Sequence, residues 1–474
     1  MKRRRNGPNL IILFLLTTSI VVIVGVVGLF VMQGKGNAGG RAGVKKASAE
    51  SDADGTGRAS DNAADSGPVR YAEAIPERIP DAGQDASGLY SASDAKAQGN
   101  SSEADASTAD ALTADGEGSD LLNDRYAGVV SRFGDDLDDP EYLRANNIHV
   151  IESRDGDEGN VTLTFAGDIL FDDEYAVYSK LLANGGAINA GIDQQVINYM
   201  KSSDVMLLNN EFPYTNRGTP TPDKTYTFRA DTSTAHLITD MGVNVVGLAN
   251  NHAYDFGREG FLDTLDTLDE AGIPYIGGGR NINEASAPIY FVVDGVKVGI
   301  VAATQIERLD NPDTKGATDT EPGVFRCLNP GRMLGVIGEM KEKCDFVVAF
   351  VHWGTESTTE VDWLQTDQAP RIAGAGADLI IGAHPHVLQP IGTSGGVPVF
   401  YSLGNFWFNS KELDTCLVRA TVNTEGLVSL RFVPCRQVGC KTYMATGDEK
   451  TRILNDVRAM SPGVNVDAEG YVTY

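Results

Sequence analysis

Positive charge and histidine are both scarce in this chain. Of its 474 residues, 39 are Lys or Arg, 65 are Asp or Glu, and six are His. The formal net charge of −26 repels nucleic acid and anionic lipid at long range, so no nucleic-acid partner is expected. Because the histidines are so few, a place where several of them gather is a candidate functional site.

Cysteine is also scarce, and its spacing matches no thiolate motif. The five cysteines are Cys327, Cys344, Cys416, Cys435 and Cys440, and no two have C-x-x-C spacing. Cys435 and Cys440 are near enough in sequence for a local disulfide, and small buried residues are an equal alternative. A nucleophilic Ser or Cys triad is disfavoured, because no G-x-S-x-G motif is present and the cysteines lie away from the histidine motifs.

A long hydrophobic run lies near the N-terminus. Residues 1–9 form a basic tail, and residues 10–32 follow without a charge. That run is long enough to span a bilayer as a helix, and long for the apolar part of a cleaved signal peptide, which is the alternative. Since the basic tail should stay cytoplasmic, we predict a single-pass signal anchor in the cell membrane, with the main domain extracytoplasmic.

Composition divides the rest of the chain. Residues 33–120 are rich in Ala, Ser, Asp and Gly, cannot bury enough apolar surface to fold, and are interpreted as a disordered acidic linker. Residues 121–159 are predicted to form a lead-in segment, in which residues 121–148 have some helical periodicity. A compact domain is predicted over residues 160–442, and residues 443–474 predict a C-terminal helix and extension that pack on it.

Alternation of strands and helices predicts an α/β fold for this domain. The expected strands are short, largely β-branched apolar runs: VTLTFAG, DVMLLN, NVVGLA, DFVVAFV, DLIIGA and VPVFYSLG. Asp294 and Gly295 separate two such runs and predict a tight hairpin. Helical patterns such as REGFLDTLDTLDEAG lie between the strands.

Polar side chains suited to metal binding follow the expected strands. Sheets of α/β proteins bind ligands at the carboxyl ends of their strands. The residues at these ends are Asp168, Asn209, Asn210, Glu211, Asn250, Asn251, His252, Asp255, His352, Glu356, His384, His386 and Asn405. Imidazole, carboxylate and amide oxygen together suit Zn, Mn or Fe, so we predict one or two divalent metal ions here. His149 and His236 fall outside the pattern and are interpreted as structural.

The tripeptide His384-Pro385-His386 predicts how two ions could be served. Pro385 fixes the backbone between the two imidazoles. Strand-like alternation would point them in different directions, so each could bind a different ion of a pair. A pair of ions would clamp a phosphate ester.

The ordered series of motifs resembles one protein family. FAGD, NNEFP, ANNHAYDFG, VHWGTE, GAHPH and SLGNF occur in this order within roughly residues 160–410. The series strongly resembles the CapA-type bacterial capsule synthesis proteins of the poly-γ-glutamate capsule family. That resemblance implies a calcineurin-like metallophosphoesterase fold, which is an α/β/β/α sandwich, and a role in capsule or poly-γ-glutamate biosynthesis.

The resemblance also implies roles for single residues. One metal ion would be held by Asp168, Glu211 and His386, and a second by Glu211, Asn251, His352 and His384. His252 would be the general acid. The superfamily often has Asp-x-His in its first motif, whereas this chain has Asp168-Ile169-Leu170, so the first ion lacks the imidazole of that motif. Asp172 or Asp173 could compensate, but both are interpreted as solvated loop carboxylates.

Substrate contacts are expected around the metal ions. The predicted substrate-binding residues are Asn210, Asp255, Arg229, Glu356 and Asn405. Lys224, Arg229 and Trp353 could line the pocket, since a cation near an anionic substrate is favourable; an ordinary surface pair and a packed aromatic ring are the alternative. The expected partner is a phosphate ester or an anionic polymer.

Three functions fit this sequence. The first is a membrane-anchored, metal-dependent phosphoesterase-like hydrolase. The second is a non-catalytic, metal-binding component of polymer assembly or export, working with other capsule-synthesis membrane proteins, and the missing imidazole at position 170 favours it. The third is a metal-dependent amide hydrolase acting on γ-linked glutamate, because metal centres also promote attack on carbonyl groups.

Overall fold

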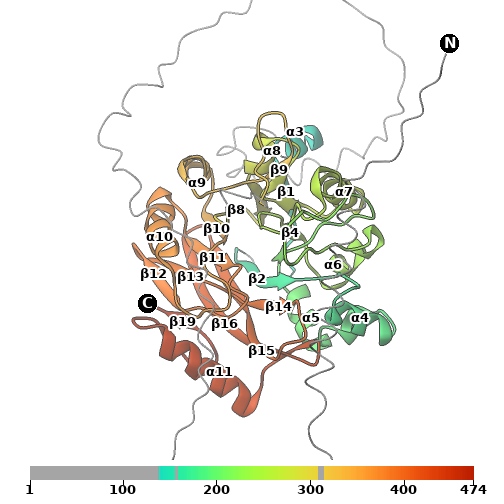
Figure 1. Cartoon of the computed structure of the whole chain (residues 1–474). Coiled ribbons are helices and arrows are strands. Elements are labelled where there is room, and N and C mark those ends of the chain that lie inside the picture. The colour runs from blue at the N-terminus through green and yellow to red at the C-terminus, as the bar shows by residue number, and fades with distance from the viewer. Residues whose placement is uncertain (1–136, 138, 155–158, 308–313) are drawn as a thin grey trace, which may run out of the picture. The chain divides into compact units, whose positions relative to one another are not determined.

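The computed structural model describes residues 137, 139–154, 159–307 and 314–474 (Figure 1). The predicted basic tail, membrane anchor and acidic linker, residues 1–120, lie outside these residues, as does much of the predicted lead-in. Among the residues that are described, no helix has the length and apolarity needed to cross a membrane.

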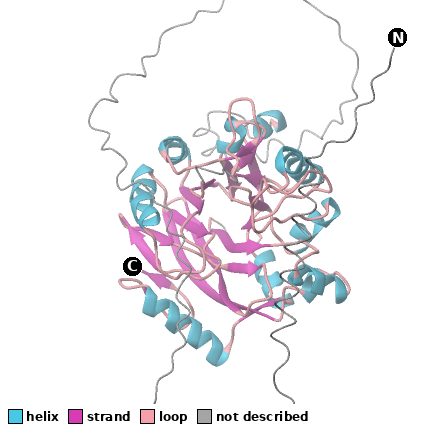
Figure 2. Ribbon diagram, viewed as in Figure 1, coloured by secondary structure: helices cyan, strands magenta, loops and turns pink. Residues whose placement is uncertain are grey.

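Two large mixed β-sheets form the centre of the described part (Figure 2). The order of the seven-stranded sheet is β1 (Ile148–Ile151), β7 (Ile289–Val293), β8 (Val296–Thr304), β10 (Phe346–His352), β11 (Leu379–Ala383), β13 (Val397–Phe400) and β12 (Ile391–Ser394). The order of the eight-stranded sheet is β17 (Lys441–Met444), β16 (Gly426–Val438), β15 (Leu413–Asn423), β2 (Val161–Ile169), β3 (Val205–Asn210), β4 (Val245–Gly247) and β5 (Tyr275–Ile276), with β14 (Asn405–Trp407) paired to β2. Two small sheets pair β6 (Gly278–Gly279) with β9 (Gly323–Val324), and β18 (Asn465–Val466) with β19 (Val472–Thr473).

The two sheets pack face to face over an apolar core. Phe165 and Leu207 of the eight-stranded sheet and Val348, Phe350 and Ile381 of the seven-stranded sheet belong to this core. Every residue of β2, β3, β10 and β11 is buried. Strands that are covered on both faces have continuous apolar runs instead of alternating apolar and polar residues. For this reason the apolar runs in the sequence predicted these strands.

Helices cover the outer faces of both sheets (Figure 1). The eight-stranded sheet packs against α4 (Ala176–Ala183), α5 (Gln194–Lys201), α6 (His236–Asp240) and α7 (Gly257–Glu270), with the 3-10 helices η1 (Ile188–Ala190) and η2 (Thr232–Ala235) nearby. The seven-stranded sheet packs against α3 (Pro140–Ala145), α8 (Ile282–Ser286), α9 (Gly331–Lys343) and α10 (Trp363–Ala375). The layers therefore run helix, sheet, sheet, helix, and the prediction of a mixed α/β fold is confirmed.

Local sequence signals explain where several elements begin and end. Asp294 and Gly295 have φ values of 48° and 85° and join the antiparallel strands β7 and β8, as a two-residue turn with positive φ at both positions requires. Asp362 and Gln365 form a reciprocal capping box at the start of α10. The same helix ends at Gly376, whose φ of 116° is favourable only for glycine.

Both ends of the described region join the fold. β1 pairs in parallel with β7, so residues 148–151 already belong to the seven-stranded sheet. At the other end, α11 (Gly447–Met460) inserts Ile453, Leu454 and Val457 into the core between the sheets. The backbone N–H of Phe432 donates to the carbonyl of Gly470, which fastens the C-terminal extension to β16.

All five cysteines are buried and free of disulfide bonds among the described residues. Of the two alternatives for Cys435 and Cys440, the structure therefore shows small buried side chains rather than a bridge. Burial raises the pKa of the Cys344 and Cys435 thiols to about 12.

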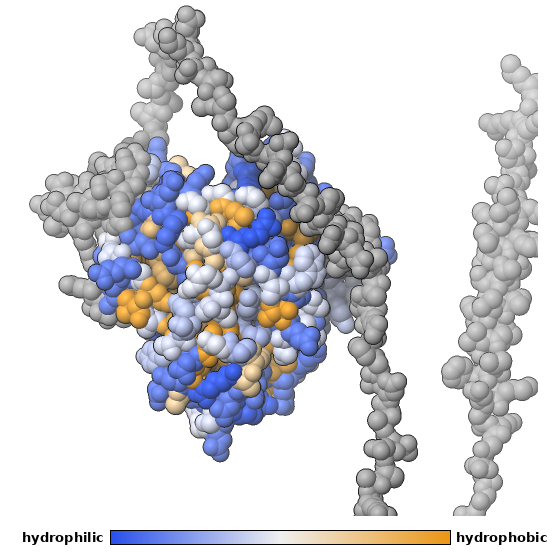
Figure 3. Space-filling view, turned by 90° about the vertical axis from the view of Figure 1, so that its left-hand side faces the viewer, coloured by the Kyte–Doolittle hydropathy of each residue, from blue (hydrophilic) through white to orange (hydrophobic). Residues whose placement is uncertain are grey.

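One face of the described part carries several separate hydrophobic patches among hydrophilic side chains (Figure 3). The large apolar side chains that are most exposed in the structure are Leu182, Tyr226, Trp363, Val428, Tyr471 and Tyr474. Scattered apolar residues of this kind are common on folded domains.

Candidate metal centre

The ends of neighbouring strands bring the predicted metal ligands together. Asp168 lies near the end of β2, Glu211 directly after β3, and His352 at the end of β10. Two groups of side chains offer ligand atoms that all lie within 4.8 Å of one another: Glu211, His352 and His384, and Asp168, Glu211 and His386. Glu211 belongs to both groups, as a carboxylate between two ions would.

The first of these groups places two imidazoles against an amide oxygen. His352 Nε2 lies 3.1 Å from His384 Nδ1, 2.8 Å from Asn251 Oδ1 and 3.6 Å from Glu211 Oε1. Burial, followed by the charges of neighbouring histidines, holds the pKa of both His352 and His384 well below the usual range. Both rings are therefore neutral near pH 7 and have a lone pair available for a cation.

The second group has a more acidic environment. His386 Nδ1 lies 3.2 Å from Asp168 Oδ2, and His386 Nε2 lies 3.9 Å from Glu211 Oε1. Burial opposes the charged form of His386, but the nearby carboxylate of Asp168 favours that form more strongly, so the pKa of His386 is raised. Nδ1 of His386 is also 2.7 Å from Asn405 Oδ1, which orients the ring.

Two carboxylate oxygens in this centre have no hydrogen-bond donor. Asp168 Oδ2 and Glu211 Oε1 are buried and accept no hydrogen bond within the described residues. Burial, and then the charge of Asp168, raises the pKa of Glu211 well above its usual range. Because buried polar atoms are nearly always satisfied, a cation is the partner that this arrangement lacks. The residues present therefore fit a divalent metal ion.

A strained turn positions the two histidines after β11. His384 and His386 have φ values of 99° and 60°, a left-handed region that costs side chains other than glycine about 1–3 kcal/mol. The backbone N–H of Ser357 donates to the carbonyl of Pro385 at 2.9 Å and holds the turn from the other side. Such strain is typical of functional sites, where the surrounding structure fixes an unfavourable conformation.

The position that lacks an imidazole is apolar. Leu170 is fully buried in the core beside the eight-stranded sheet. Asp172 does not replace the imidazole, because its two oxygens accept the backbone N–H groups of Glu174 and Arg229 at 2.9 and 2.8 Å. Asp172 is also buried rather than solvated, whereas Asp173 is exposed.

His252 lies beside Asn251 and is held by a buried carboxylate. Its Nδ1 is 2.7 Å from Asp255 Oδ2. Asp255 also accepts Lys224 Nζ at 2.6 Å and the N–H of Phe228 at 2.7 Å. Burial, opposed by Asp255, lowers the pKa of His252. The carboxylate therefore fixes the proton on Nδ1 and leaves Nε2 of a neutral ring free.

The predicted substrate-binding residues have different surroundings. Asp255 contacts His252, and Asn405 contacts His386, so each lies behind one histidine of the centre. Asn210 donates to the carbonyl of Phe212 at 2.7 Å. Because alternate residues of a strand point to opposite faces, Asn210 lies on the face away from Asn209 and Glu211.

Three other predicted residues have separate surroundings. The Arg229 guanidinium lies 4.7 Å from the centroid of the Phe256 ring. Glu356 is exposed and lies directly before Ser357, which is bonded to the His384–His386 turn. Trp353 is fully buried and donates to the carbonyl of Tyr401 at 2.9 Å, so it packs in the interior as the alternative interpretation had it.

Sequence reasoning gave no role to two buried amides that contact this centre. Asn209 Nδ2 lies 2.8 Å from Asp168 Oδ1, and Asn250 Nδ2 lies 3.0 Å from Asn209 Oδ1. Both residues are the first members of Asn–Asn doublets, one at the end of β3 and the other shortly after β4. The doublets were the available signal, but the sequence does not say which member faces the carboxylates.

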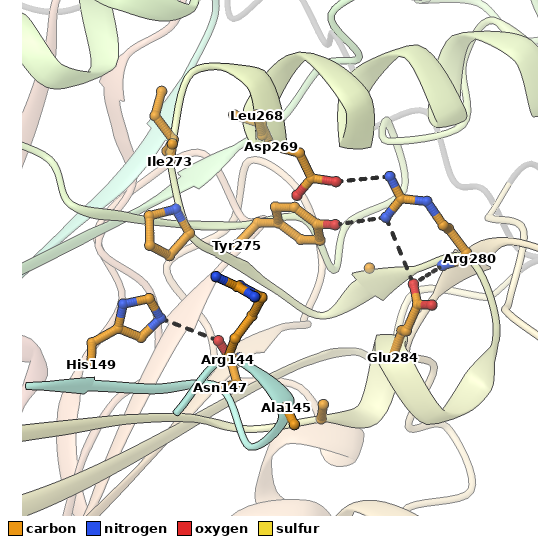
Figure 4. A pocket seen from close by; sticks show the side chains of 14 residues that line it. Arg144, Ala145, Asn147, His149, Leu268, Asp269, Ile273, Tyr275, Arg280 and Glu284 are labelled. Atoms are coloured by element: carbon orange, nitrogen blue, oxygen red, sulfur yellow. Dashed lines mark hydrogen bonds and ion pairs between the residues drawn. The ribbon is translucent and has the colours of Figure 1, made fainter. Parts of the chain in front are cut away.

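A cavity of about 700 Å³ lies elsewhere in the fold and contains none of the predicted ligands (Figure 4). Arg280 on its wall is bonded to Asp269 and to the Tyr275 hydroxyl. His149, also on its wall, contacts Asn147 at 3.2 Å and packs near the Phe291 ring. These side chains satisfy one another, so His149 keeps its structural interpretation.

Comparisons with known proteins agree with the motif series. A model of the family described as "Bacterial capsule synthesis protein PGA_cap" matches residues 162–410. The "Capsule biosynthesis protein CapA" of Bacillus anthracis is 29% identical over 327 residues, which cover 66% of this chain and 76% of that protein. The "PGA biosynthesis protein CapA" of Bacillus subtilis is 30% identical over 282 residues, which cover 58% of this chain and 71% of that protein.

A more distant relative has a related description. The "Probable polyglutamine synthesis accessory protein" of Mycobacterium tuberculosis is 26% identical over 278 residues, covering 55% of this chain and 73% of that protein. The family match itself spans more than half of the chain. The resemblance predicted from the motifs is therefore confirmed, and this chain belongs to the CapA-type bacterial capsule synthesis family, PGA_cap.

Proposed function

We propose that this chain is a capsule or poly-γ-glutamate biosynthesis protein with a metal-dependent phosphoesterase-like hydrolase site, anchored in the cell membrane with its main domain outside. The names of the relatives support the biosynthetic role. One observation supports the hydrolase site: Asp168 Oδ2 and Glu211 Oε1 are buried with no hydrogen-bond donor among the described residues, beside three imidazoles. The basic tail and apolar run of residues 1–32 support the anchor.

The metal would be Mn, Zn or Fe, because its ligands are imidazoles, carboxylates and an amide oxygen. One ion would be held by Asp168, Glu211 and His386, and the other by Glu211, Asn251, His352 and His384. When bound, such ions supply Lewis acidity toward an ester and a nucleophile at neutral pH. Glu211 belongs to both sets, so it would help to hold both ions.

The chain's own residues orient a proton donor beside the metal ligands. Asp255 holds the His252 ring through Nδ1, so Nε2 is the atom that would exchange a proton with an ester. The neutral ring has its proton on Nδ1, so it would first take up a second proton at Nε2 and then pass that proton to the leaving oxygen. Lys224 neutralises Asp255 within a buried ion pair and also contacts the carbonyl of Asn251 at 2.5 Å. This pair joins the loop before Phe228 to the segment that carries His252.

The proposal is tested by metal content and turnover of the purified full-length chain. We expect it to bind Mn or Zn and to hydrolyse a generic phosphomonoester or phosphodiester. Replacing a shared ligand in Glu211→Ala, or an imidazole in His384→Ala, should abolish turnover. His236→Ala is the matched control, because His236 is exposed and its ring is hydrogen-bonded to the Ser233 carbonyl, away from the predicted ligands. Unchanged turnover in both ligand variants would reject the hydrolase site.

A second function is favoured by Leu170. With a leucine where an imidazole often stands, the ion beside Asp168 has fewer protein ligands. A non-catalytic chain would then use its metal to grip the carboxylates of a polymer during assembly or export with other membrane proteins. One tightly held ion per chain, with no turnover of any phosphate ester, would favour this function over hydrolysis.

A further inference from the structure

The amide of Asn209 contacts both carboxylates of the candidate metal centre. Its Nδ2 lies 2.8 Å from Asp168 Oδ1 and 3.2 Å from Glu211 Oε2. The same nitrogen is 3.3 Å from His352 Nδ1. Asn209 is only 1% exposed, so water does not compete for these contacts. An amide NH2 group has two hydrogens, one for each carboxylate.

The oxygens that Asn209 holds are the opposite ones from those that lack a donor. Within the described residues, Asp168 Oδ2 and Glu211 Oε1 accept no hydrogen bond. Asp168 Oδ2 lies 3.2 Å from His386 Nδ1, and Glu211 Oε1 lies 3.6 Å from His352 Nε2. By binding one oxygen of each carboxylate, Asn209 fixes the rotation of both groups and turns the remaining oxygens toward the imidazoles.

A second asparagine fixes the direction of the Asn209 amide. Asn250 Nδ2 donates to Asn209 Oδ1 at 3.0 Å and to the carbonyl of Asn210 at 2.9 Å. If the Asn209 amide were reversed, its carbonyl oxygen would face two carboxylates and its NH2 group would face another NH2 group. Only one of the two orientations is therefore consistent with the hydrogen bonds.

The same chain of amides reaches the proposed proton donor. Asn250 Oδ1 accepts the backbone N–H of His252 at 3.1 Å. Asn250 thus connects the Asn209 amide to the segment that carries Asn251 and His252. The two asparagine doublets form one buried unit, in which the first member of each doublet provides the connection.

We propose that Asn209 is a positioning residue for the metal centre: its amide presets Asp168 and Glu211 with one oxygen each turned toward the imidazoles, and Asn250 fixes that amide. This inference rests on the metal centre of the proposed function. Groups that hydrogen-bond to metal ligands typically change metal affinity by about 10- to 100-fold when they are removed. Asn209 touches two ligands at once, so an effect in this range is expected.

The test is Mn²⁺ binding to the metal-free full-length chain. Calorimetry measures the affinity, and electron paramagnetic resonance reports the surroundings of the bound ion. Asn209→Leu keeps the same number and branching of side-chain heavy atoms and removes both donors, and Asn209→Ser keeps a single hydroxyl donor that cannot serve both carboxylates. Asn244→Leu is the matched control, because Asn244 also links strands by hydrogen bonds, to the N–H of Met206 and the carbonyl of Asp204, but contacts no predicted ligand.

We expect about 10- to 100-fold weaker Mn²⁺ binding, and an altered resonance spectrum, for both Asn209 variants. Asn244→Leu should bind Mn²⁺ as the parent chain does, even if it unfolds at a lower temperature. Parent-like Mn²⁺ affinity in Asn209→Leu or in Asn209→Ser would overturn the positioning role. So would an equal loss of affinity in Asn244→Leu, since that would show a general effect of stability.

The two proposals fail in different ways. A parent chain that binds Mn²⁺ but hydrolyses no phosphate ester contradicts the hydrolase and leaves the positioning role supported by the affinity series. A parent chain that hydrolyses the ester while the Asn209 variants keep full Mn²⁺ affinity contradicts the positioning role alone. A parent chain that binds no divalent metal overturns both.

Discussion

At the scale of single residues, the neighbours of each histidine set its charge and its use. His352 and His384 face each other in a buried place that lowers the pKa of both, whereas His386 lies against Asp168, which raises its pKa. His252 is held by Asp255 rather than by the predicted ligands. The four histidines at strand ends therefore have different environments, and His252 is the one suited to proton transfer.

His252→Ala is expected to separate proton donation from metal binding. Loss of a general acid typically costs about 10²–10⁴-fold in rate, so turnover of an alkyl phosphate ester should fall within that range. A nitrophenyl ester, whose leaving group needs no proton, should lose far less. Steady-state rates on the two esters, with metal content measured on the same samples, provide the comparison.

Two other results would contradict the role of His252 as general acid. Equal losses on the two esters with parent-like metal content would show that His252 does not protonate the leaving group. A loss of bound metal would instead place His252 among the ligands.

The sequence could predict which residues meet, but not every contact that they make. Asp168, Glu211, His352 and His384 follow buried strands, and the carboxyl ends of such strands gather in α/β folds. The choice between Asn209 and Asn210 depends on which strand face points toward the second sheet, and the apolar runs around them carry no alternation that reveals it. Asp172 was interpreted as solvated, but its partner Arg229 is 57 residues away, beyond any local pattern.

At the scale of elements, close backbone contact brings β14 against β2. A Cβ atom on Gly167 would lie 1.8 Å from the carbonyl oxygen of Gly404. That carbonyl accepts the N–H of Asp168 at 3.2 Å, and Asn405 then pairs with Asp168. The absence of a side chain at position 167 therefore lets Asn405 reach His386, one of the predicted metal ligands.

Gly167→Ala is expected to push β14 away from β2. Overpacking of this kind typically lowers the free energy of unfolding by about 1–3 kcal/mol. Because Asp168 and Asn405 lie in the displaced segments, Mn²⁺ affinity should fall as well. Urea unfolding and Mn²⁺ titration measure the two effects.

Gly335→Ala is the matched control for this substitution. Gly335 lies inside α9 with nothing within 4 Å of an added Cβ, so alanine should be neutral or raise the free energy of unfolding by about 0.5–1 kcal/mol. If Gly167→Ala unfolds at the parent's urea concentration and binds Mn²⁺ equally well, the close contact does not position the site.

Elements with local signals were predictable, and those defined by distant partners were not. The β7–β8 hairpin follows from Asp294-Gly295, and α10 from its capping residues and Gly376. β1 and β14 are only four and three residues long, and each exists through pairing with a strand more than a hundred residues away. No short-range pattern marks such strands.

At the scale of the whole molecule, the two facing sheets bury ionisable groups that a smaller core would leave in water. Burial raises the pKa of the Cys344 and Cys435 thiols to about 12, whereas a free thiol titrates near about 8.5. The stabilisation from keeping these thiols neutral is complete below the unfolded pKa. It is lost as the pH rises toward the folded pKa, because only the unfolded chain ionises in this window.

The free energy of unfolding should therefore decline from about pH 9 toward about pH 12. Urea unfolding across this range measures the slope, and Cys435→Ala should make it shallower. Reducing agent should leave the melting temperature unchanged, because the cysteines form no disulfide among the described residues. A profile that stays flat above about pH 9, or the same slope in Cys435→Ala, would show that the buried thiols do not govern alkaline stability.

The central claim is that side chains from distant strands form one metal centre. Anomalous diffraction from crystals of the protein soaked with Mn²⁺ or Zn²⁺ tests it most directly, because it counts the ions and identifies their ligands together. We expect anomalous density among Glu211, His352 and His384, and among Asp168, Glu211 and His386. Well-ordered crystals with neither position occupied at saturating metal would contradict it.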